Sequence, residues 1–303
     1  MRIGSKVFGD VRIFAGSGSL ALAEEVCRYL DVPLNPRQVI EFPNENIFVK
    51  LQTSVRGQDV FIIQTTAAPV HYNIMELLIF LDTLKRANAG RITAVIPYFA
   101  YGRSDKKDQP RVPITARLLA DLIAVAGANR YLVLDLHAGQ IQGFFNIPGD
   151  ELTTFHLLSD YLLTKNLSNA VVVSADLGFA KKGRNFAQKL DLPMAFIEKR
   201  RAGNDARAQA LGVIGDVRGK DVIIVDDEVD TAGSVSDAVR IVKENDAADV
   251  YLSFVHPVLS GPAVDRLRAL PIKEIVTTNT VAVPESKRLP NMTILSVAPL
   301  LAK

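Results

Sequence analysis

The stretch "VIIVDDEVDTAGS", residues 222–234, joins the pattern of a buried strand to a group of acids and then to small residues. Its first four residues are all apolar, which is typical of a strand covered on both faces in a parallel sheet. Asp226, Asp227, Glu228 and Asp230 follow within a few positions, and residues 231–234 then open a helical pattern. Because ligands of open α/β sheets bind beyond the carboxyl ends of the strands, this junction indicates a binding site.

The residue types at the junction suit a phosphorylated sugar. Small residues let successive backbone N–H groups converge on an anion, and Thr231 and Ser234 can add hydroxyl donors. A phosphate held there would place the sugar beside Asp226 and Asp227. The alternative is a helix N-terminus with acids favoured in the preceding turn, but capping explains only one or two acids. The Val-rich strand that runs directly into Asp-Asp therefore favours the sugar-phosphate site.

The rest of the chain alternates short β-branched runs with amphipathic stretches. The predicted strands are Val11–Ala15, Asp59–Gln64, Arg91–Pro97, Tyr131–Leu136, Ala170–Ser174, Val222–Val225, Asp249–Val255 and Glu274–Thr278. The predicted helices include Asn73–Ala87, Ile114–Ala126, Leu152–Leu163 and Val235–Glu244. This alternation predicts an α/β architecture with mainly parallel sheets. With these and the remaining short apolar runs we expect ten or more strands, which are too many for one compact sheet of ordinary size. We therefore predict two α/β domains, residues 1–149 and 150–303, divided near Pro148-Gly149.

Composition excludes several classes of protein. The 303 residues are 48% hydrophobic and 22% charged, with a net charge of +2, so there is no overall attraction to nucleic acid or to a membrane. No apolar run approaches the ~20 residues of a membrane span. Cys27 is the single cysteine, which excludes an intramolecular disulfide and fits a reducing compartment. We expect a cytoplasmic protein.

Two motifs follow other predicted strands. "DLHAGQIQGFF" (135–145) begins with Asp135 and His137, and an imidazole near carboxylates can anchor the hydration shell of Mg²⁺ or bridge it to phosphates. "RSDKKDQPR" (103–111) reads by default as a solvated loop. Its cations follow a strand end directly, however, so they could close over a triphosphate.

A third motif, "FIEKRR" (196–201), places Lys199 just after an apolar run. Phosphoryl-type transfer depends chiefly on positioning and charge neutralisation, which a lysine can supply, although a surface basic cluster is the simpler interpretation. "GSGSLA" (16–21) satisfies a dinucleotide-binding pattern, but that motif is weak by itself, and we interpret it as a tight strand–helix turn. The chain has no G-x-x-x-x-G-K-[ST] motif, which argues against a P-loop ATPase.

The order of these motifs resembles the phosphoribosyl-diphosphate (PRPP) synthetases, also called ribose-phosphate diphosphokinases, over nearly the full chain. The matching stretches are "SVRGQDVFIIQTT" (54–66), "NIMELLIFLDTLKRANAGRITAVIPYFAYGRSDKK" (73–107), "RVPITARLLADLI" (111–123), "DLHAGQIQGFFNIP" (135–148), "EKRR" (198–201) and "DDEVDTAGS" (226–234). The last stretch also resembles the ribose-5-phosphate loop of type I phosphoribosyltransferases, but those shorter chains lack the first four. The resemblance implies two tandem Rossmann-like domains of the type I phosphoribosyltransferase fold.

The resemblance also implies an activity, namely transfer of the diphosphate group of Mg-ATP to the anomeric hydroxyl of ribose 5-phosphate, which yields PRPP and AMP for nucleotide biosynthesis. It implies Mg²⁺ as the cofactor and a homohexamer built from dimers. The implied catalytic residues are Lys199 and Arg103, and the implied metal ligands are His137 and Asp176. Nucleotide contacts are implied for Phe42, Asn44, Asn46, Arg103, Ser104 and Lys106. Ribose 5-phosphate contacts are implied for Arg201, Asp226, Asp227, Asp230, Thr231, Ala232, Gly233 and Ser234.

Departures from the family pattern lead to two further expectations. Asn44 and Asn46 replace two acids of the adenine-binding pattern, so we expect altered nucleotide preference. The sequence ends at "SVAPLLAK" (296–303), before a segment that helps to build the family's regulatory site, although Arg56 of that site is present. We therefore expect weak control by phosphate and ADP. Two other functions stay open: a phosphoribosyltransferase that consumes PRPP, and a catalytically silent regulatory subunit that binds the sugar phosphate.

Overall fold

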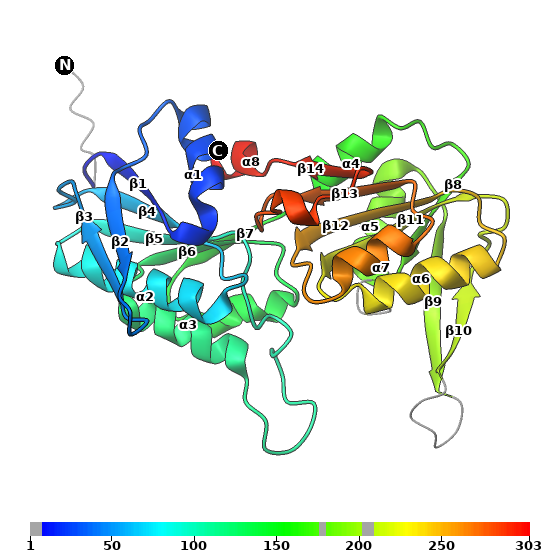
Figure 1. Cartoon of the computed structure of the whole chain (residues 1–303), viewed down its shortest axis with the longest axis horizontal. Helices are drawn as coiled ribbons and strands as arrows, with labels where there is room; N and C mark the ends of the chain where they lie inside the picture. The colour runs from blue at the N-terminus through cyan, green and yellow to red at the C-terminus, as the bar shows by residue number, and fades with distance from the viewer. Residues whose placement is uncertain (1–7, 176–179, 202–208) are drawn as a thin grey trace. The chain divides into compact units, whose positions relative to one another are not determined.

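The computed structural model describes residues 8–175, 180–201 and 209–303. The chain divides into two compact units (Figure 1). Unit 1 contains residues up to Thr153 together with Thr280–Ala282 and Val297–Lys303, and unit 2 contains Thr154–Asn279 and Val283–Ser296. These units separate four residues after the predicted boundary at 149/150, and the chain's last residues group with unit 1. The functional domains 1–149 and 150–303 stay a prediction.

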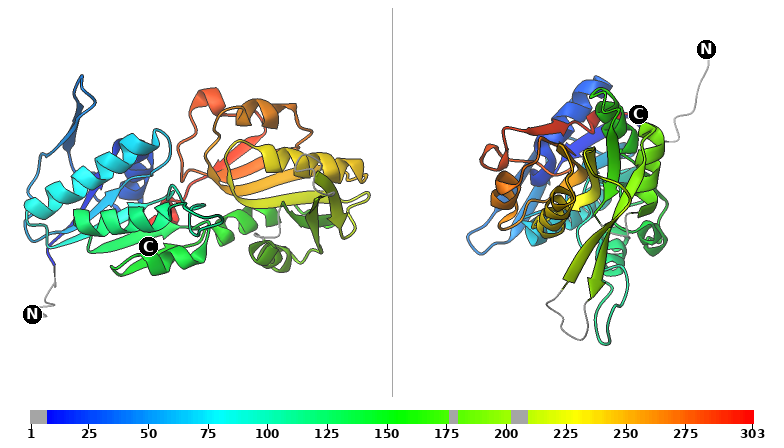
Figure 2. Two further views of the ribbon diagram at one scale, coloured as in Figure 1. Left: turned by 90° about the horizontal axis from the view of Figure 1, so that it is seen from below. Right: turned by 90° about the vertical axis from the view of Figure 1, so that its right-hand side faces the viewer.

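Unit 1 is built on a parallel sheet of five strands in the order β1-β4-β5-β6-β7. The strands are β1 (Val11–Ala15), β4 (Asp59–Ile63), β5 (Arg91–Ile96), β6 (Arg130–Leu134) and β7 (Gly149–Leu152). A separate antiparallel hairpin consists of β2 (Arg37–Glu41) and β3 (Ile47–Leu51) and projects beyond this sheet (Figure 2). The helical segments are η1 (Ser17–Ser19), α1 (Leu20–Leu30), α2 (Val70–Arg86), α3 (Thr115–Ala126), η2 (Gly139–Phe144) and α8 (Ala298–Leu301).

The core of unit 1 lies between the sheet and two helices. Leu77, Phe80 and Leu84 of α2 and Leu119 and Ile123 of α3 pack on alternate side chains of the strands, and all five are buried. Leu22, Val26 and Cys27 of α1 are also buried, and α1 lies against β1 and α8. This arrangement follows from parallel pairing, because each crossover between neighbouring strands needs a connection long enough to hold a helix.

Unit 2 is built on a sheet of seven strands in the order β10-β9-β8-β11-β12-β13-β14, in which only the β9–β10 pair is antiparallel. The strands are β8 (Ala170–Ser174), β9 (Met194–Arg201), β10 (Gln209–Ile214), β11 (Asp221–Val229), β12 (Val250–Pro257), β13 (Glu274–Thr278) and β14 (Met292–Leu295). The helical segments are α4 (Phe155–Leu163), α5 (Ala180–Leu190), α6 (Gly233–Glu244), α7 (Ala263–Ala269) and η3 (Glu285–Lys287). Strands β9 and β10 extend as a ribbon beyond the other strands (Figures 1 and 2).

Two cores cover the two faces of this sheet. One joins α6 and α7 to one set of alternate strand residues, including Ile224, Leu252 and Ile275. The other joins α4 and α5 to the intervening residues, including Val225 and Val276. The predicted α/β fold with mainly parallel sheets is therefore confirmed. Across the three described ranges, no helix combines the length and the apolar character needed to cross a bilayer.

Some predicted boundaries are wrong. The predicted helix Leu152–Leu163 begins only at Phe155, because Leu152 pairs with Leu134 and ends β7. The predicted strand Val222–Val225 is the first part of β11, which continues to Val229 because β12 stays paired with it. Strands β2, β3, β7, β9, β10 and β14 were not predicted.

Candidate functional site

Strand β11 carries the acids that the sequence places after a strand. Within the described residues, β8 pairs with β11 only as far as Val225, which lies opposite Ser174. On the other side, β12 continues to pair up to Val229 and places Asp226 opposite Phe254. The acids thus lie on β11 beyond its last residue paired with β8. This position agrees with the rule that α/β proteins bind ligands at strand ends.

Backbone bonds hold the acids of β11 in place. The Asp227 N–H donates to Asp226 Oδ1 at 2.9 Å, and the Glu228 N–H donates to Asp227 Oδ1 at 2.9 Å. Asp227 and Glu228 are buried, whereas Asp226 is half-buried. A buried carboxylate is costly unless it accepts hydrogen bonds, so these short-range bonds stabilise a row of acids that would otherwise be unfavourable.

The turn after β11 leads into α6 through Ala232, which adopts the left-handed conformation (φ 58°, ψ 19°). A neighbouring segment holds this turn. The N–H groups of Leu259 and Ser260 donate to the carbonyls of Val229 and Asp230, each at 2.9 Å. Arg266 Nη1 of α7 donates to the Thr231 carbonyl at 2.9 Å. The first N–H groups of a helix have no partner within the helix, so this turn presents donors suited to an anion.

Arg266 and Ser260 hold the loop after β11, but the sequence analysis did not predict them as site residues. They lie about thirty residues beyond the loop in sequence, and only the pairing of β11 with β12 brings the segments together. A signal was present in "LSGPAVDR" (259–266), which follows a predicted strand and opens a helix in the same way as the loop itself.

In unit 1, strand β6 ends before the predicted metal histidine. The predicted strand Tyr131–Leu136 ends at Leu134, because Asp135 takes a positive φ of 38° and turns the chain. The Asp135 carboxylate is buried and accepts a hydrogen bond from Thr153 Oγ1 at 2.8 Å. The Leu136 N–H donates to Glu151 Oε1 at 2.8 Å. These contacts fix the turn that leaves His137 exposed.

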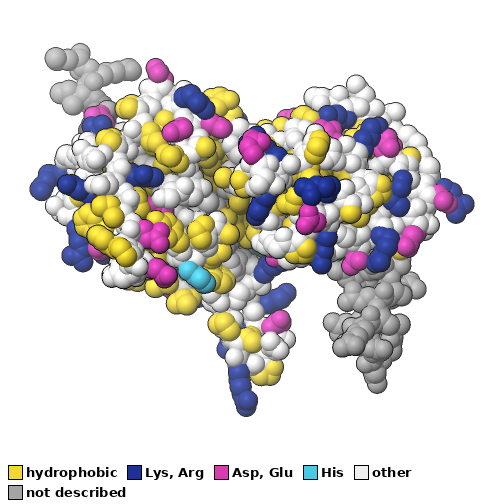
Figure 3. Space-filling model, viewed as in Figure 1, with side chains coloured by type: hydrophobic (Ala, Val, Ile, Leu, Met, Phe, Trp, Pro, Cys, Tyr) yellow, Lys and Arg dark blue, Asp and Glu magenta, His cyan; other side chains and the backbone are white. Residues whose placement is uncertain are grey.

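The charged loop after β5 begins at the same edge of the sheet, since β5 and β6 are parallel neighbours. Arg103 and Lys106 are exposed, and the tip of this loop carries Lys and Arg side chains in Figure 3. Ser104 differs from them. Its hydroxyl oxygen accepts the N–H of Thr115 at 3.2 Å, where α3 begins. The side chain expected to contact a nucleotide therefore closes the base of the loop.

The predicted nucleotide residues Phe42, Asn44 and Asn46 lie in the turn of the β2–β3 hairpin. The Phe42 N–H donates to the Asn46 carbonyl at 2.9 Å, and Asn44 Oδ1 accepts the Asn46 N–H at 3.3 Å. The Phe42 ring is exposed and lies 6.5 Å from the Phe48 ring, centroid to centroid. The hairpin thus carries an exposed aromatic ring at one end of a short hydrogen-bonded turn.

The remaining predicted residues can be placed only in part. Lys199 and Arg201 lie on β9, where they pair with Leu211 and Gln209 of β10. Asp176 lies outside the described residues. Within the described ranges, no group of three or more His, Cys, Asp or Glu side chains could hold a metal ion.

The "GSGSLA" turn is held by hydrogen bonds to side chains of unit 1. Its Ser17 N–H donates to both oxygens of Glu76, at 3.0 and 3.1 Å, and the Gly18 N–H donates to Gln64 Oε1 at 3.1 Å. A Cβ on Gly16 would lie 2.2 Å from the same Gln64 oxygen. Donors that would face a dinucleotide phosphate in the motif therefore bind buried side chains, which agrees with a tight strand–helix turn.

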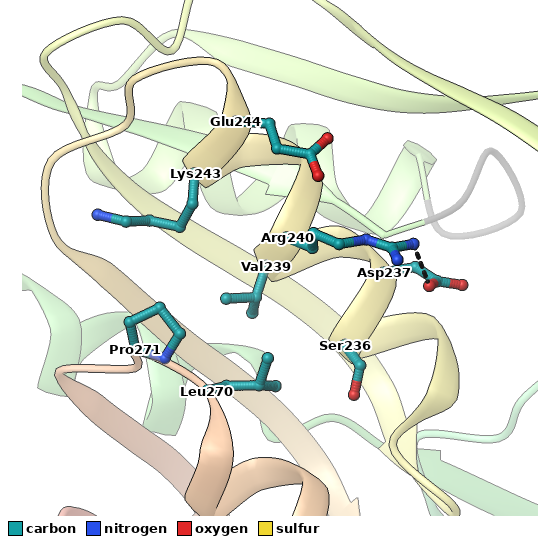
Figure 4. A pocket seen from close by; sticks show the side chains of 8 residues that line it. All are labelled: Ser236, Asp237, Val239, Arg240, Lys243, Glu244, Leu270 and Pro271. Atoms are coloured by element: carbon teal, nitrogen blue, oxygen red, sulfur yellow. Dashed lines mark hydrogen bonds and ion pairs between the residues drawn. The ribbon is translucent and has the colours of Figure 1, made fainter.

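Unit 2 also has a surface groove of about 560 Å³ between α6 and the residues after α7 (Figure 4). Its cations are already engaged. Arg240 Nη2 lies 2.9 Å from Asp237 Oδ1, and Lys243 Nζ donates to the carbonyls of Ala247 and Ala248. Both cations that line the groove are therefore paired within unit 2, and we assign no ligand to it.

The fold and these residues define a class: α/β proteins with parallel sheets and polar loops at the strand ends. Two family models that match the chain define the family within this class. The N-terminal domain of ribose phosphate pyrophosphokinase matches residues 11–127, and the phosphoribosyl synthetase-associated domain matches residues 206–302.

Individual proteins agree with these models. A ribose-phosphate pyrophosphokinase of Synechococcus elongatus is 47% identical over 97% of this chain and 89% of its own length. The same enzyme of Clostridium perfringens is 46% identical over 97% of this chain and 92% of its own length. The crystal structure of phosphoribosylpyrophosphate synthetase from Mycobacterium smegmatis has a TM-score of 0.92 and 42% identity, with 97% of each chain covered. The chain belongs to the ribose-phosphate pyrophosphokinase family.

Proposed function

We propose that the protein transfers the diphosphate group of Mg-ATP to the anomeric hydroxyl of ribose 5-phosphate and releases AMP. The observation that carries this proposal is the extent of the family match, which covers 97% of the chain and therefore both units. A silent regulatory subunit that only binds the sugar phosphate would need the β11–α6 region of unit 2. It would not need the loops of unit 1, which the family match also covers.

In unit 2 we assign the sugar phosphate to the β11–α6 region. Backbone N–H groups and hydroxyls of residues 230–234 hold the 5-phosphate, while Asp226 and Asp227 accept hydrogen bonds from the ribose hydroxyls. Arg201 supplies a cation to the same phosphate. The support for this assignment is the turn held by Ser260 and Arg266, which presents the first turn of α6.

In unit 1 we assign the nucleotide. Its contacts come from residues of the hairpin turn and of the charged loop, namely Phe42, Asn44, Asn46, Arg103, Ser104 and Lys106. The anomeric oxygen attacks the β-phosphorus and loses its hydroxyl proton to water, while the bond from that phosphorus to the α-phosphate oxygen breaks and AMP leaves. Arg103 and Lys199 neutralise the negative charge of the transferring group, and holding the attacking oxygen in line supplies much of the rate.

Mg²⁺ as the cofactor needs few protein ligands. It keeps several waters and binds substrate phosphates, so the Asp176 carboxylate, with the His137 imidazole anchoring the hydration shell, would suffice. When bound, the ion neutralises charge on the phosphates. The exposed His137, set by the Asp135 turn, supports this assignment.

The family resemblance further supports a homohexamer, in which the exposed Phe42 ring serves a neighbouring subunit. A cytoplasmic location stays a prediction from the sequence. Light scattering of the purified protein measures its mass, and a monomeric mass would contradict the proposed assembly.

Phosphorus NMR tests the activity directly. The protein is mixed with ribose 5-phosphate, ATP and Mg²⁺, and we expect PRPP and AMP in equal amounts. Turnover only with PRPP and a nucleobase would identify a phosphoribosyltransferase instead. No turnover in either mixture would identify a silent regulatory subunit.

A further inference from the structure

Two segments with proposed roles meet in unit 1: the start of the charged loop, which carries Arg103, and the segment after β6, which carries His137. Gly102 is buried at the contact. A Cβ added to it would lie 3.2 Å from His137 Cβ and 3.9 Å from Ile141 Cδ1. The backbone before Arg103 therefore lies directly against the His137 segment.

Asp105 differs in exposure from the residues that follow it in the charged loop. It is 8% exposed, whereas the residues from Lys106 to Arg111 are all exposed. Gln140 of η2, three residues after His137, donates its Nε2–H to Asp105 Oδ2. A buried carboxylate needs such a donor to offset lost hydration, so the Gln140 bond stabilises the inward position of Asp105.

The two ends of the loop are also joined to each other. Ser104 Oγ accepts the Thr115 N–H at 3.2 Å, and the Ser104 carbonyl accepts the Ala116 N–H at 3.2 Å. Residues 106–114 thus extend from a base that is closed at Ser104 and tied to η2 at Asp105. Figure 1 shows this loop projecting away from the sheet of unit 1.

We propose that Asp105 is a positioning residue: through Gln140 it fixes the Arg103 end of the loop on the His137 segment. Arg103 is two residues from Asp105, and His137 is three residues from Gln140, so this one bond sets how the two proposed active groups are spaced. The proposal rests on the proposed function for its effect on turnover, but the bond itself can be tested without substrate.

The first test is limited trypsin digestion of the full chain without substrate, with cleavage followed after Lys106, Lys107 and Arg111. Gln140→Ala leaves the sequence around these bonds unchanged and removes the donor to Asp105. We expect cleavage to be about tenfold faster, the lower end of the effect of losing a hydrogen bond to a charged group, because this bond is only part-buried. Gln142→Ala is the matched control, because Gln142 lies in the same η2 segment and donates to Glu151 instead. Equal cleavage of the two variants would overturn the proposal.

The second test is kinetic. Gln140→Ala and Asp105→Ala should lower kcat about tenfold and change the KM for ribose 5-phosphate less than twofold, because the sugar phosphate is assigned to unit 2. Asp105→Asn keeps an acceptor oxygen and should restore most of kcat. The Asp105→Ala/Gln140→Ala double variant should be no worse than either single variant, since both remove one bond.

The outcomes separate the two proposals. An active enzyme whose kcat is unaffected by Gln140→Ala would contradict the positioning role alone. A wild-type chain that makes no PRPP would contradict the proposed function, while faster cleavage of Gln140→Ala would still support the Asp105–Gln140 contact.

Discussion

Glu274 shows at the residue scale how neighbours change the proton affinity of one carboxylate. It lies on β13 and accepts hydrogen bonds from Tyr161 at 2.6 Å and Thr293 at 2.9 Å, while Lys165 Nζ lies 2.8 Å from Oε2. Burial by itself raises the pKa of Glu274, but the bonds from Lys165, Tyr161 and Thr293 outweigh it, and the net pKa is lowered. Ionised Glu274 therefore stabilises the fold by joining α4 to β13 and β14.

We predict that this stabilisation is lost in acid. Because the folded pKa of Glu274 is below the unfolded value of about 4.3, its contribution is present above that value and disappears as the pH falls through the folded pKa. Urea unfolding at pH values from 7 to 3 measures it. Glu274→Gln should be less stable than wild type at pH 7, and the difference should shrink toward pH 3. If the difference in the free energy of unfolding were the same at every pH, the charge of Glu274 would have no part in the stabilisation.

A second residue-scale prediction concerns Ser253 in the middle of β12. Its side chain is 1% exposed, and within the described residues its hydroxyl has no hydrogen-bond partner. An unsatisfied buried hydroxyl costs about 1 kcal/mol or more, so Ser253→Ala should leave the free energy of unfolding unchanged or raise it by about 1 kcal/mol. Thr278→Val is the control, since Thr278 Oγ1 donates to the Val255 carbonyl at 2.8 Å and its loss should destabilise. Equal destabilisation of both variants would show that Ser253 has a partner.

At the scale of elements, one buried acid joins three segments of unit 1. Glu76 of α2 is fully buried and accepts hydrogen bonds from Ser17 Oγ at 2.8 Å and from Gln64 Nε2 at 2.8 Å, besides the Ser17 N–H. Ser17 follows β1 and Gln64 follows β4, so Glu76 holds the ends of two neighbouring strands against the start of α2.

Replacement of Glu76 by Gln should therefore destabilise the protein. The amide would place a donor against groups that themselves donate, and we expect a loss of about 3 kcal/mol in the free energy of unfolding. Chemical denaturation measures this loss. Asp82→Asn is the control, because Asp82 lies on the same helix in an exposed pair with Arg86, and it should change stability by less than about 0.5 kcal/mol. A Glu76→Gln protein as stable as this control would contradict the network.

For the whole molecule, the division of substrates between the units can be tested at Asp226. Asp226→Asn removes a charge-assisted acceptor for a ribose hydroxyl and should weaken ribose 5-phosphate binding about tenfold. Titration calorimetry with ribose 5-phosphate and, separately, with Mg-ATP measures both affinities. Asp237→Asn, an exposed acid on α6 paired with Arg240, should leave both unchanged. If Asp226→Asn affected only Mg-ATP binding, the assignment of the β11–α6 region to the sugar would be wrong.

The sequence by itself determined the strands that consist of an apolar, β-branched run, and it determined the position of the acids. Ala170–Ser174, Val11–Ala15 and Glu274–Thr278 are strands with the predicted bounds, because a run of apolar and β-branched residues encodes a buried strand locally. Strands without such a run were missed. One is β7, with the mixed sequence Gly149–Leu152, which pairing with β6 stabilises more than local propensity does.

Only the tertiary structure decided the partners of the polar side chains. Asp105 belongs to a charge run that reads as a solvated loop, yet it is buried against Gln140, which is 35 residues away in sequence. Ser104 stays a predicted nucleotide contact, but the sequence did not show that its hydroxyl oxygen also accepts the Thr115 N–H. The physical reason is that a hydrophobic period is repeated over many neighbouring residues, whereas a hydrogen bond depends on two atoms whose meeting is set by the packing of the whole unit.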